Sequence, residues 1–312
     1  MRPPAHRLDC RGNKLQLGSR TLIMGILNVT PDSFADGGRY LEPQHAIERA
    51  LLMAEEGADI IDVGGESTRP AGPYGAGAQP VSAEEEIRRT APVIDEIAAR
   101  TNLIISIDTT KAAVAQSAIQ QGATIVNDIS AMRFDPLMGA TIAKSGAAVV
   151  LMHMKGTPRT MQIKPVYHNL MREILDFLDE RRTAAIEAGI DPGRILIDPG
   201  LGFGKRYAHN FEILARLEEF HNLDCPLMVG PSRKKFIGAA LDLPPEARLH
   251  GTLAAVGFSA AAGAHIVRVH DVGAAVQAVR VAEQIVAASV AGCRAPKETR
   301  CRKSQTHMRQ PA

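Results

Sequence analysis

The sequence predicts a single α/β domain, a (β/α)8 TIM barrel in which eight parallel strands alternate with helices. Three observations predict this fold. Short apolar runs rich in β-branched residues recur eight times, segments with helical periodicity separate them, and a polar side chain follows nearly every run. Apolar runs of this kind are typical of strands covered on both faces, and eight strand–helix units in about 270 residues match one closed barrel.

The eight predicted strands do not alternate between apolar and polar residues, which distinguishes them from half-exposed strands. In chain order they are Leu22–Val29, Asp59–Val63, Leu103–Ile107, Thr124–Ile129, Ala147–Met152, Ile195–Ile197, Pro226–Val229 and His265–Val269. Right-handed crossovers make closure of such units into a barrel feasible. A doubly wound open sheet is the main alternative, but it usually has a glycine-rich phosphate-binding turn after its first strand, and the segment 25–28 (GILN) is not one.

The segments between the strands have the period of amphipathic helices. Three core-facing stripes are expected: Ile47, Leu51, Ala54 and Ala58; Ile87, Ala91, Ile94 and Ala98; and Val272, Val276, Val279, Ala282 and Val286. Ser82 followed by Glu85 predicts a capping box at the start of the second helix, because each side chain can satisfy a free backbone N–H of the other residue.

The two ends of the chain lie outside the repeating pattern. We expect residues 1–20 to form a small hairpin across the bottom of the barrel, with Arg11-Gly12-Asn13 as its turn, and residues 21–288 to form the barrel. Residues 289–312 are expected to be a flexible basic tail. From Gly292 onward the chain has six Lys or Arg residues against one Glu and no apolar periodicity, which favours a solvated, disordered end over a nucleic-acid or lipid contact.

Composition excludes several classes of protein. Apolar residues at 45% and charged residues at 22% are near the globular average, which argues against disorder, collagen-like repeats and a coiled-coil rod. A net charge of +2 provides no basic field for nucleic acid, and no apolar run is long enough to span a membrane. Residues 1–19 are too polar for a signal-peptide core, so we expect a cytoplasmic protein whose four scattered cysteines are reduced.

Polar side chains at the ends of the predicted strands indicate a ligand site. In barrels of this type the site is built from the carboxyl ends of the strands and the loops that follow them. Every predicted strand supplies at least one hydrogen-bonding side chain there. Because burying so many polar groups together is costly unless a ligand or a network satisfies them, we expect them to bind a ligand at one rim.

One half of this predicted site suits a flat heterocycle rich in N–H groups. Asp108, Asn127 and Asp198 offer acceptors at the ends of the third, fourth and sixth strands. One carboxylate can accept two parallel N–H bonds, so Asp198 is the expected partner of an amino-pyrimidine edge. Lys234 can donate to a ring oxygen or nitrogen opposite.

The other half is expected to be cationic and to bind phosphate. Arg69, Arg233, Arg268 and His270 come from the second, seventh and eighth loops, and guanidinium groups match phosphate oxygens.

Nucleophile elbows, Walker loops, zinc-ligand spacings and Ser/His/Asp sets are not found in the sequence. His153, His209 and His250 are therefore expected to be structural, and Gly202-Phe203-Gly204-Lys205 is expected to be a mobile loop that closes over substrate.

Eight motifs, in order along the chain, resemble one family, the dihydropteroate synthases of folate biosynthesis. They are Met24–Gly38, Asp62–Pro70, Ser106–Thr109, Asn127-Asp128, Leu151–Gly156, Ile197–Lys205, Ser232–Lys234 and Arg268–Asp271. The resemblance covers roughly residues 20 to 286. Short pieces such as Ser-Arg-Lys are unspecific alone, but the ordered set is highly specific.

The resemblance implies a (β/α)8 barrel, a homodimer and a Mg²⁺-dependent transferase that is a target of sulfonamides. The implied reaction joins 4-aminobenzoate to 6-hydroxymethyl-7,8-dihydropterin diphosphate and releases diphosphate and 7,8-dihydropteroate. Loss of diphosphate leaves a cation on the pterin methylene, which nearby carboxylates stabilise, so no protein nucleophile is required.

The resemblance also implies roles for individual residues. The pterin contacts would be Asp108, Asn127, Met152, Asp198 and Lys234, of which Asp108, Asp198 and Lys234 would be catalytic. The diphosphate contacts would be Thr68, Arg69, Arg268 and His270, with Asn28 as a metal ligand. The aminobenzoate pocket would contain Phe34, Pro70, Phe203, Ser232 and Lys235. Residues 30–38 and 68–70 would belong to mobile loops.

Two departures from the family pattern concern substrate contacts. The second loop, residues 71–80, is longer than in some members, and Lys235 stands where many members have a small hydroxyl residue. Two alternatives are kept. A methyltetrahydrofolate–corrinoid methyltransferase shares the pterin acceptors but needs no diphosphate pocket, and a non-catalytic pterin-binding barrel would have lost motif residues that are present here.

Overall fold

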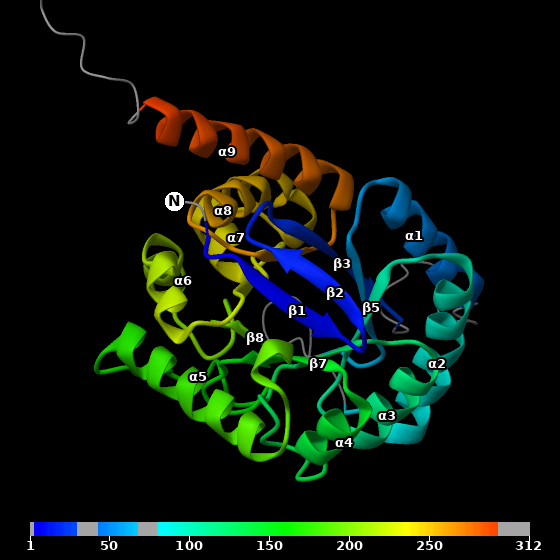
Figure 1. The fold of residues 1–312 in the computed structure, drawn as a ribbon. Coiled ribbons are helices and arrows are strands. Elements are labelled where there is room, and N and C mark those ends of the chain that lie inside the picture. The colour runs from blue at the N-terminus through cyan, green and yellow to red at the C-terminus, as the bar shows by residue number, and fades with distance from the viewer. Residues whose placement is uncertain (1–2, 30–42, 68–79, 293–312) are drawn as a thin grey trace, which may run out of the picture.

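The computed structural model describes residues 3–29, 43–67 and 80–292, and it shows a closed parallel barrel ringed by helices (Figure 1). The barrel strands are β3 (Leu22–Asn28), β4 (Ile60–Gly64), β5 (Ile104–Asp108), β6 (Ile125–Asp128), β7 (Ala148–Met152), β8 (Ile195–Asp198), β9 (Met228–Val229) and β10 (Ile266–Val269). They pair in the order β8-β7-β6-β5-β4-β3-β10-β9, and a parallel bridge between Ile197 and Leu227 joins the two edges. The predicted (β/α)8 fold is confirmed.

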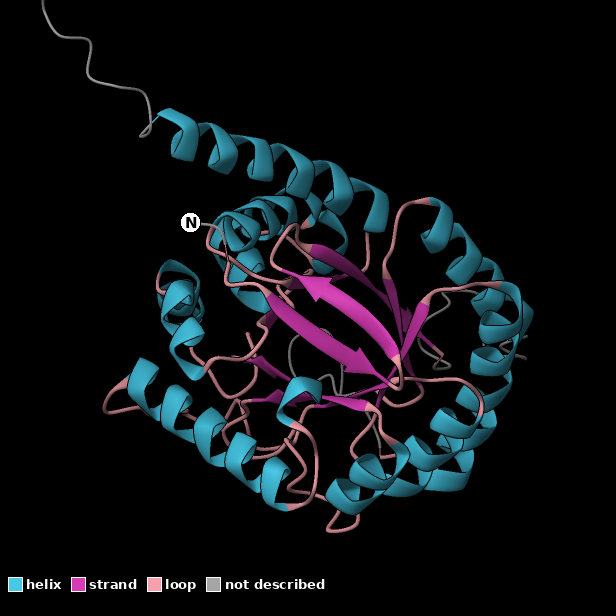
Figure 2. Cartoon of the chain, in the orientation of Figure 1, coloured by secondary structure: helices cyan, strands magenta, loops and turns pink. Residues whose placement is uncertain are grey.

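The helices surround the strands on the outside, as Figure 2 shows. They are α1 (Pro43–Glu55), α2 (Ala83–Arg100), α3 (Ala112–Gln120), α4 (Met138–Ser145), α5 (Leu170–Glu187), α6 (Tyr207–Ala215), α7 (Lys235–Leu241), α8 (Leu249–Ala261) and α9 (Val272–Gly292), with short 3₁₀ helices η2 (Pro192–Arg194), η3 (Leu217–Leu223) and η4 (Pro245–Ala247). One apolar cluster fills the space between strands and helices, and a second fills the inside of the barrel. None of the helices in the described ranges is long and apolar enough to cross a membrane.

A hairpin covers the amino end of the barrel (Figure 1). Strands β1 (His6–Cys10) and β2 (Asn13–Leu17) pair antiparallel around a two-residue turn, Arg11-Gly12, whose φ angles of 53° and 89° are left-handed. Turns of this kind match the twist of a hairpin. The inner faces of the two strands, with Leu8 and Leu17, pack on side chains that point into the barrel, such as Met24. The hairpin therefore closes the barrel at this end.

Helix boundaries and faces differ from the predicted stripes in three places. Helix α1 ends at Glu55, because Gly57 has a left-handed φ of 99°, so Ala58 lies beyond the helix. Helix α9 continues to Gly292, past the predicted limit of the barrel at residue 288, and residues 293–312 of the predicted tail lie outside the described residues. In α2 the predicted face is rotated: Ala98 is exposed.

The buried face of α2 includes two polar residues, which explains the rotation. The residues buried there are Glu86, Thr90, Val93, Ile94 and Ile97. Apolar periodicity does not detect such polar positions. At the helix start Ser82 accepts the predicted hydrogen bond from Glu85 N, at 3.2 Å. The reciprocal half of the predicted capping box is absent, because the Glu85 carboxylate accepts from Arg88 and Arg89 instead.

Candidate active site

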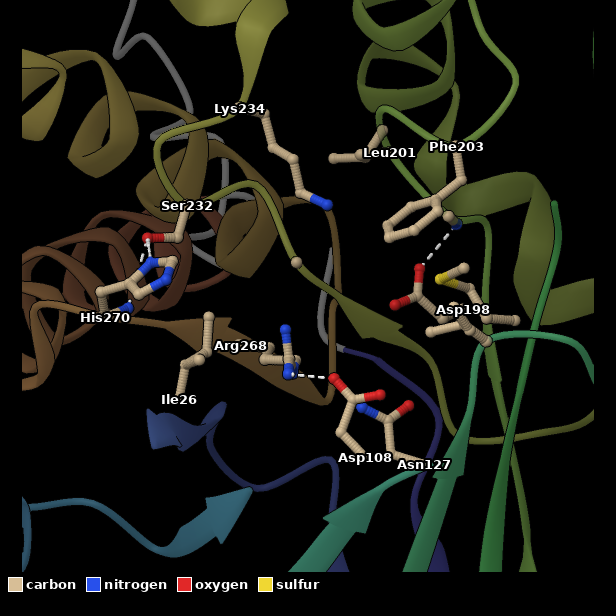
Figure 3. A pocket seen from close by; sticks show the side chains of 14 residues that line it. Ile26, Asp108, Asn127, Asp198, Leu201, Phe203, Ser232, Lys234, Arg268 and His270 are labelled. Carbon is tan, nitrogen blue, oxygen red and sulfur yellow. Dashed lines mark hydrogen bonds and ion pairs between the residues drawn. The ribbon is translucent and has the colours of Figure 1, made fainter. Parts of the chain in front are cut away.

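A pocket of about 620 Å³, including its open mouth, lies at the carboxyl ends of the barrel strands (Figure 3). Its lining is made of Ile26, Asp108, Asn127, Ile129, Met152, Asp198, Gly200, Leu201, Phe203, Gly230, Ser232, Lys234, Arg268 and His270. Nine of these are predicted site residues: Asp108, Asn127, Met152, Asp198, Phe203, Ser232, Lys234, Arg268 and His270. These nine side chains come from six of the eight strand ends or from the loops that follow them.

The remaining predicted site residues lie elsewhere or outside the described ranges. Asn28 ends β3 with an exposed side chain, and Lys235 is a half-buried residue that begins α7. Neither lines the pocket. Phe34, Thr68, Arg69 and Pro70, with the predicted mobile loops around them, lie outside the described residues.

Arg268 joins two carboxylates at the base of the pocket. Its Nε donates to Asp62 Oδ2 at 2.6 Å and its Nη2 donates to Asp108 Oδ2 at 2.7 Å. Asn127 Nδ2 also donates to Asp62 Oδ2, at 2.9 Å. This bond fixes the orientation of the Asn127 amide, whose oxygen stays available as an acceptor. The predicted acceptor half and the predicted cationic half are therefore one network.

Asp62 connects this network, and the sequence analysis gave it no role. It is fully buried within β4, and its Oδ1 has no hydrogen-bond partner among the described residues. The available signal was a charged residue inside an otherwise apolar strand, Ile60–Gly64. A buried carboxylate is stable only when it is paired, so such a residue indicates a cation close by.

The ionisation of the pocket groups reflects burial first and neighbouring charges second. Burial raises the pKa of Asp108 to about 7, against the opposing effect of the Arg268 guanidinium, while Asp62 raises it further. Burial alone would lower the pKa of Arg268, but Asp62 and Asp108 hold it above its usual value, so Arg268 stays charged. Asp108 therefore exchanges its proton near neutral pH.

Asp198, Lys234 and Phe203 form the opposite wall of the pocket (Figure 3). Asp198 Oδ1 accepts from Gly200 N at 2.7 Å, and burial raises the pKa of this carboxyl. Lys234 Nζ lies 4.3 Å from the centre of the Phe203 ring, within the range of a cation–π contact. Burial, together with the Arg268 charge, lowers the pKa of Lys234 to about 8. This wall combines an acceptor, a cation and an aromatic face.

Ser232 and His270, which also line the pocket, form a hydrogen-bonded pair. Ser232 Oγ accepts from the backbone N of His270 at 3.2 Å and lies 2.8 Å from His270 Nδ1. The hydroxyl can donate to Nδ1 or accept from it, and where it donates, Nε2–H is the ring donor. Burial, with Arg268 and Arg233, lowers the pKa of His270 to about 3. Burial therefore favours the neutral imidazole of His270, whereas the sequence predicted a cation there.

Arg233 does not belong to the pocket, contrary to the predicted cationic cluster. Its Nε and Nη2 donate to the two carboxylate oxygens of Asp271 at 3.1 and 2.6 Å. The guanidinium is therefore paired outside the pocket lining. Among the arginines in the described ranges, Arg268 is the one that lines the pocket.

The glycine-rich segment 200–205 is tightly packed, in contrast to the expected mobile loop. Lys205, only 2% exposed, places its Nζ 2.8 Å from His153 Nδ1 and donates to Phe203 O at 3.0 Å. A Cβ on Gly200 would lie 2.0 Å from His153 O, so this backbone approach requires glycine. His153 contacts Lys205 and does not line the pocket. The segment holds Phe203 in place against the end of β7.

A second charged network lies behind Asp108. Lys111 Nζ contacts the carboxylates of Glu66 and Glu86, the latter at 2.6 Å. Glu86 is fully buried, and burial raises its pKa. Its negative charge contributes to the raised pKa of Asp108. The polar face of α2 therefore acts on the electrostatics of the pocket.

Comparison with known proteins agrees with this geometry. Residues 24–270 match the family model described as pterin binding enzyme. The chain belongs to this family of pterin-binding enzymes.

Within the family its relatives are dihydropteroate synthases. The dihydropteroate synthase of Escherichia coli strain K12 is 46% identical over 282 residues, covering 90% of this chain and 97% of the relative. A Yersinia pestis dihydropteroate synthase structure with a sulfonamide drug complex has a TM-score of 0.84 at 43% identity, covering 90% of this chain and 99% of that one. A Xanthomonas albilineans dihydropteroate synthase structure with 4-aminobenzoic acid has a TM-score of 0.83 at 44% identity, covering 90% and 98%.

These findings confirm the family that the sequence motifs indicated, and they give no support to the corrinoid methyltransferase or the non-catalytic barrel. The chain is a transferase of the dihydropteroate synthase type.

Proposed function

We propose that this chain condenses 6-hydroxymethyl-7,8-dihydropterin diphosphate with 4-aminobenzoate to give 7,8-dihydropteroate and diphosphate. One observation carries the proposal: a single pocket combines buried acceptors (Asp198 and Asn127) with half-buried donors (Arg268 and His270). Acceptors match the N–H edge of a pterin, and donors match diphosphate oxygens.

Each wall has a proposed role in the reaction. Asp198 accepts from the amino-pyrimidine edge, Lys234 donates to the pterin ring, and Arg268 with the Nε2–H of His270 binds the diphosphate. The bond between the methylene carbon and the diphosphate oxygen breaks, and its electron pair leaves with diphosphate. The carboxylates of Asp108 and Asp198 stabilise the positive charge that remains on the pterin. Met152 packs against the ring.

The aromatic amine then attacks the methylene carbon, forms the C–N bond and loses a proton. Phe203 is the proposed aromatic wall for aminobenzoate, since its ring faces the pocket beside Lys234. Sulfonamides should compete for the same space, in line with the Yersinia pestis complex.

Mg²⁺ is the proposed metal, with Asn28 as one ligand. A Cβ placed on Gly64 would lie 3.7 Å from Asn28 Oδ1 and 3.9 Å from Asp108 Oδ2, so two oxygen donors flank Gly64 at the rim. Oxygen donors suit Mg²⁺. Among the described residues no group of three His, Cys, Asp or Glu is arranged to hold a metal. Diphosphate oxygens are the further ligands that we propose. When bound, the cation would neutralise charge on the leaving diphosphate.

Chelation tests this role. Excess chelator should suppress turnover, and calorimetry should detect Mg²⁺ binding only when the pterin carries its diphosphate. Full turnover in excess chelator would contradict the proposal.

A homodimer is also proposed, through α8 and α9. These adjacent helices carry large apolar side chains on the surface, with Phe258 53%, Val281 62% and Ile285 65% exposed. Exposed apolar patches mark contact surfaces. Light scattering should give twice the chain mass, and Phe258→Asp should reduce it to the mass of one chain.

The decisive test of function is diphosphate release. It should require the pterin diphosphate and aminobenzoate together, with Mg²⁺ present. Release at the same rate without aminobenzoate would show hydrolysis and not condensation.

A further inference from the structure

Between β9 and α7 the chain makes a tight turn that places two pocket residues. Lys234 N donates to Pro231 O at 3.3 Å, which closes a four-residue turn. Ser232 and Lys234, both of which line the pocket, flank Arg233, which has a left-handed φ of 54°. The third position of such a turn normally takes glycine or asparagine, because a side chain is unfavourable there. The direction of two functional side chains therefore depends on an unfavourable backbone conformation.

Arg248, the N-cap residue of α8, and Thr252 within α8 hold both backbone polar groups of Arg233. Thr252 Oγ1 accepts from Arg233 N at 3.0 Å, and Arg248 Nη1 donates to Arg233 O at 3.0 Å. Thr252 and Arg248 are 1% and 3% exposed. The side chain of Arg233 is held separately by Asp271. Unfavourable backbone conformations persist when the surrounding structure over-determines them in this way.

The buried surroundings of Arg248 accommodate its guanidinium. Arg248 Nε donates to Leu243 O at 2.9 Å, so the side chain links two backbone carbonyls across the turn and the α7–α8 connection. A Cβ on Gly238 of α7 would lie 2.2 Å from Arg248 Nε. Glycine at position 238 therefore leaves room for the buried arginine, whose planar fork suits two carbonyl acceptors.

We propose that Arg248 and Thr252 are positioning residues that hold the Ser232–Lys234 turn in its left-handed form and so direct Lys234 and the Ser232–His270 pair into the pocket. The inference rests on the proposed roles of Lys234 and His270 in pterin diphosphate binding. Without the Thr252 acceptor, the Arg233 N–H loses its hydrogen-bond partner, and the turn can relax to a negative φ. Both pocket side chains would then leave their positions.

Thr252→Val is the primary test, because it keeps the shape of the side chain and removes the acceptor. We expect kcat/KM for the pterin substrate to fall about tenfold through a higher KM for that substrate. The matched control is Ser259→Ala. Ser259 is a buried residue of the same helix, and its hydroxyl donates only within α8, to Ala255 O at 2.7 Å. This control should show unchanged kinetics at a similar melting temperature.

A second background separates positioning from general stability. In Arg233→Gly the turn residue can adopt a positive φ without the hydrogen bonds to Thr252 and Arg248. When Thr252→Val is added to Arg233→Gly, kcat/KM for the pterin substrate should therefore fall less than about threefold. The effects of the two substitutions are then not additive. A full tenfold loss in both backgrounds, or a Thr252→Val enzyme no different from Ser259→Ala, would overturn the proposal.

Lys234→Met, measured alongside, distinguishes this inference from the function on which it rests. An unchanged KM for the pterin substrate in Lys234→Met would contradict the proposed role of Lys234. The role of Arg248 and Thr252 in holding the turn would then be tested by melting temperature. Additive effects of Thr252→Val and Arg233→Gly would refute this role, and coupled effects would support it.

Discussion

At its amino end the barrel is closed by the β1–β2 hairpin, which packs apolar side chains on the strand starts. At its carboxyl end the same strands finish in Asp108, Asn127, Asp198 and Arg268 around an open pocket. At the amino end the packing beneath the hairpin is apolar, and the imidazoles of His6, His221 and His265 contact one another beside it. The carboxyl end keeps charged groups buried and leaves room between them. Stability and function are thus placed at opposite ends of the same strands, and changes at each end should have different readouts.

Asp198→Asn should produce the largest effect on function with little effect on the fold. The neutral amide can still accept from Gly200 N but loses the charge-assisted bonds to the pterin, which are worth roughly 1.5 to 3 kcal/mol. Calorimetric titration should show pterin diphosphate binding weakened by tenfold or more, with an unchanged melting temperature. Affinity within twofold of the unmodified protein would remove Asp198 from the site.

Acidification should act on stability through the amino end. His265 contacts the rings of His6 and His221, accepts from Leu227 N at 3.0 Å and donates to Pro4 O. Burial lowers the pKa of His265 to about 4. The unfolded chain binds this proton below about pH 6.5, so stability is present above that pH and is lost as the pH falls toward 4, by roughly 1 to 3 kcal/mol.

Urea unfolding between pH 7 and 4.5 measures this loss. His265→Gln should flatten the dependence, whereas His250→Gln, at an exposed position in α8, should leave it unchanged. His6 and His221, whose pKa values are also lowered by burial against the opposing charges of Asp224 and Glu218, respectively, add to the same loss. Equal slopes in both variants would contradict the role of His265.

The pH dependence of catalysis should instead follow the ionisation of groups at the carboxyl ends of the barrel strands. Asp108, with a pKa of about 7, must lose its proton to act as a carboxylate, and Lys234, with a pKa of about 8, must keep its own to donate as a cation. We therefore expect kcat/KM for the pterin substrate to fall about tenfold per pH unit well below 7 and to fall again above 8. The Lys234→Met enzyme should have a lower kcat/KM for the pterin substrate, and its kcat/KM should no longer fall above pH 8. A flat profile from pH 5.5 to 9 would refute both assignments.

Lys235→Ala should give the smallest effect. Lys235 begins α7 next to Lys234, outside the pocket lining but half-buried near its rim. An ammonium there attracts the aminobenzoate carboxylate by roughly 0.2 to 1 kcal/mol. The KM for aminobenzoate should rise a few-fold, the KM for the pterin substrate should not change, and the difference should shrink as salt increases. Equal KM values at low salt would place Lys235 outside substrate recognition.

Much of the site was predictable because strand ends meet by topology. Asp108 and Asp198 directly follow apolar runs, Asn127 and Arg268 lie near the ends of such runs, and parallel strands bring their carboxyl ends to one rim. Asp62 was missed because a charged residue within a strand has no partner that can be identified along the chain. Glu86 was missed for a related reason, since apolar periodicity passes over a buried polar position.

The sequence by itself determined the order of strands and helices, the barrel and the family, because apolar periodicity and ordered motifs are local properties of the chain. Only the tertiary structure decided the states of the site residues. Arg233 pairs with Asp271 while Arg268 bridges Asp62 and Asp108, and burial favours a neutral His270 where a cation was expected. Ion pairing and desolvation depend on distances between residues far apart in the chain, and folding alone sets those distances.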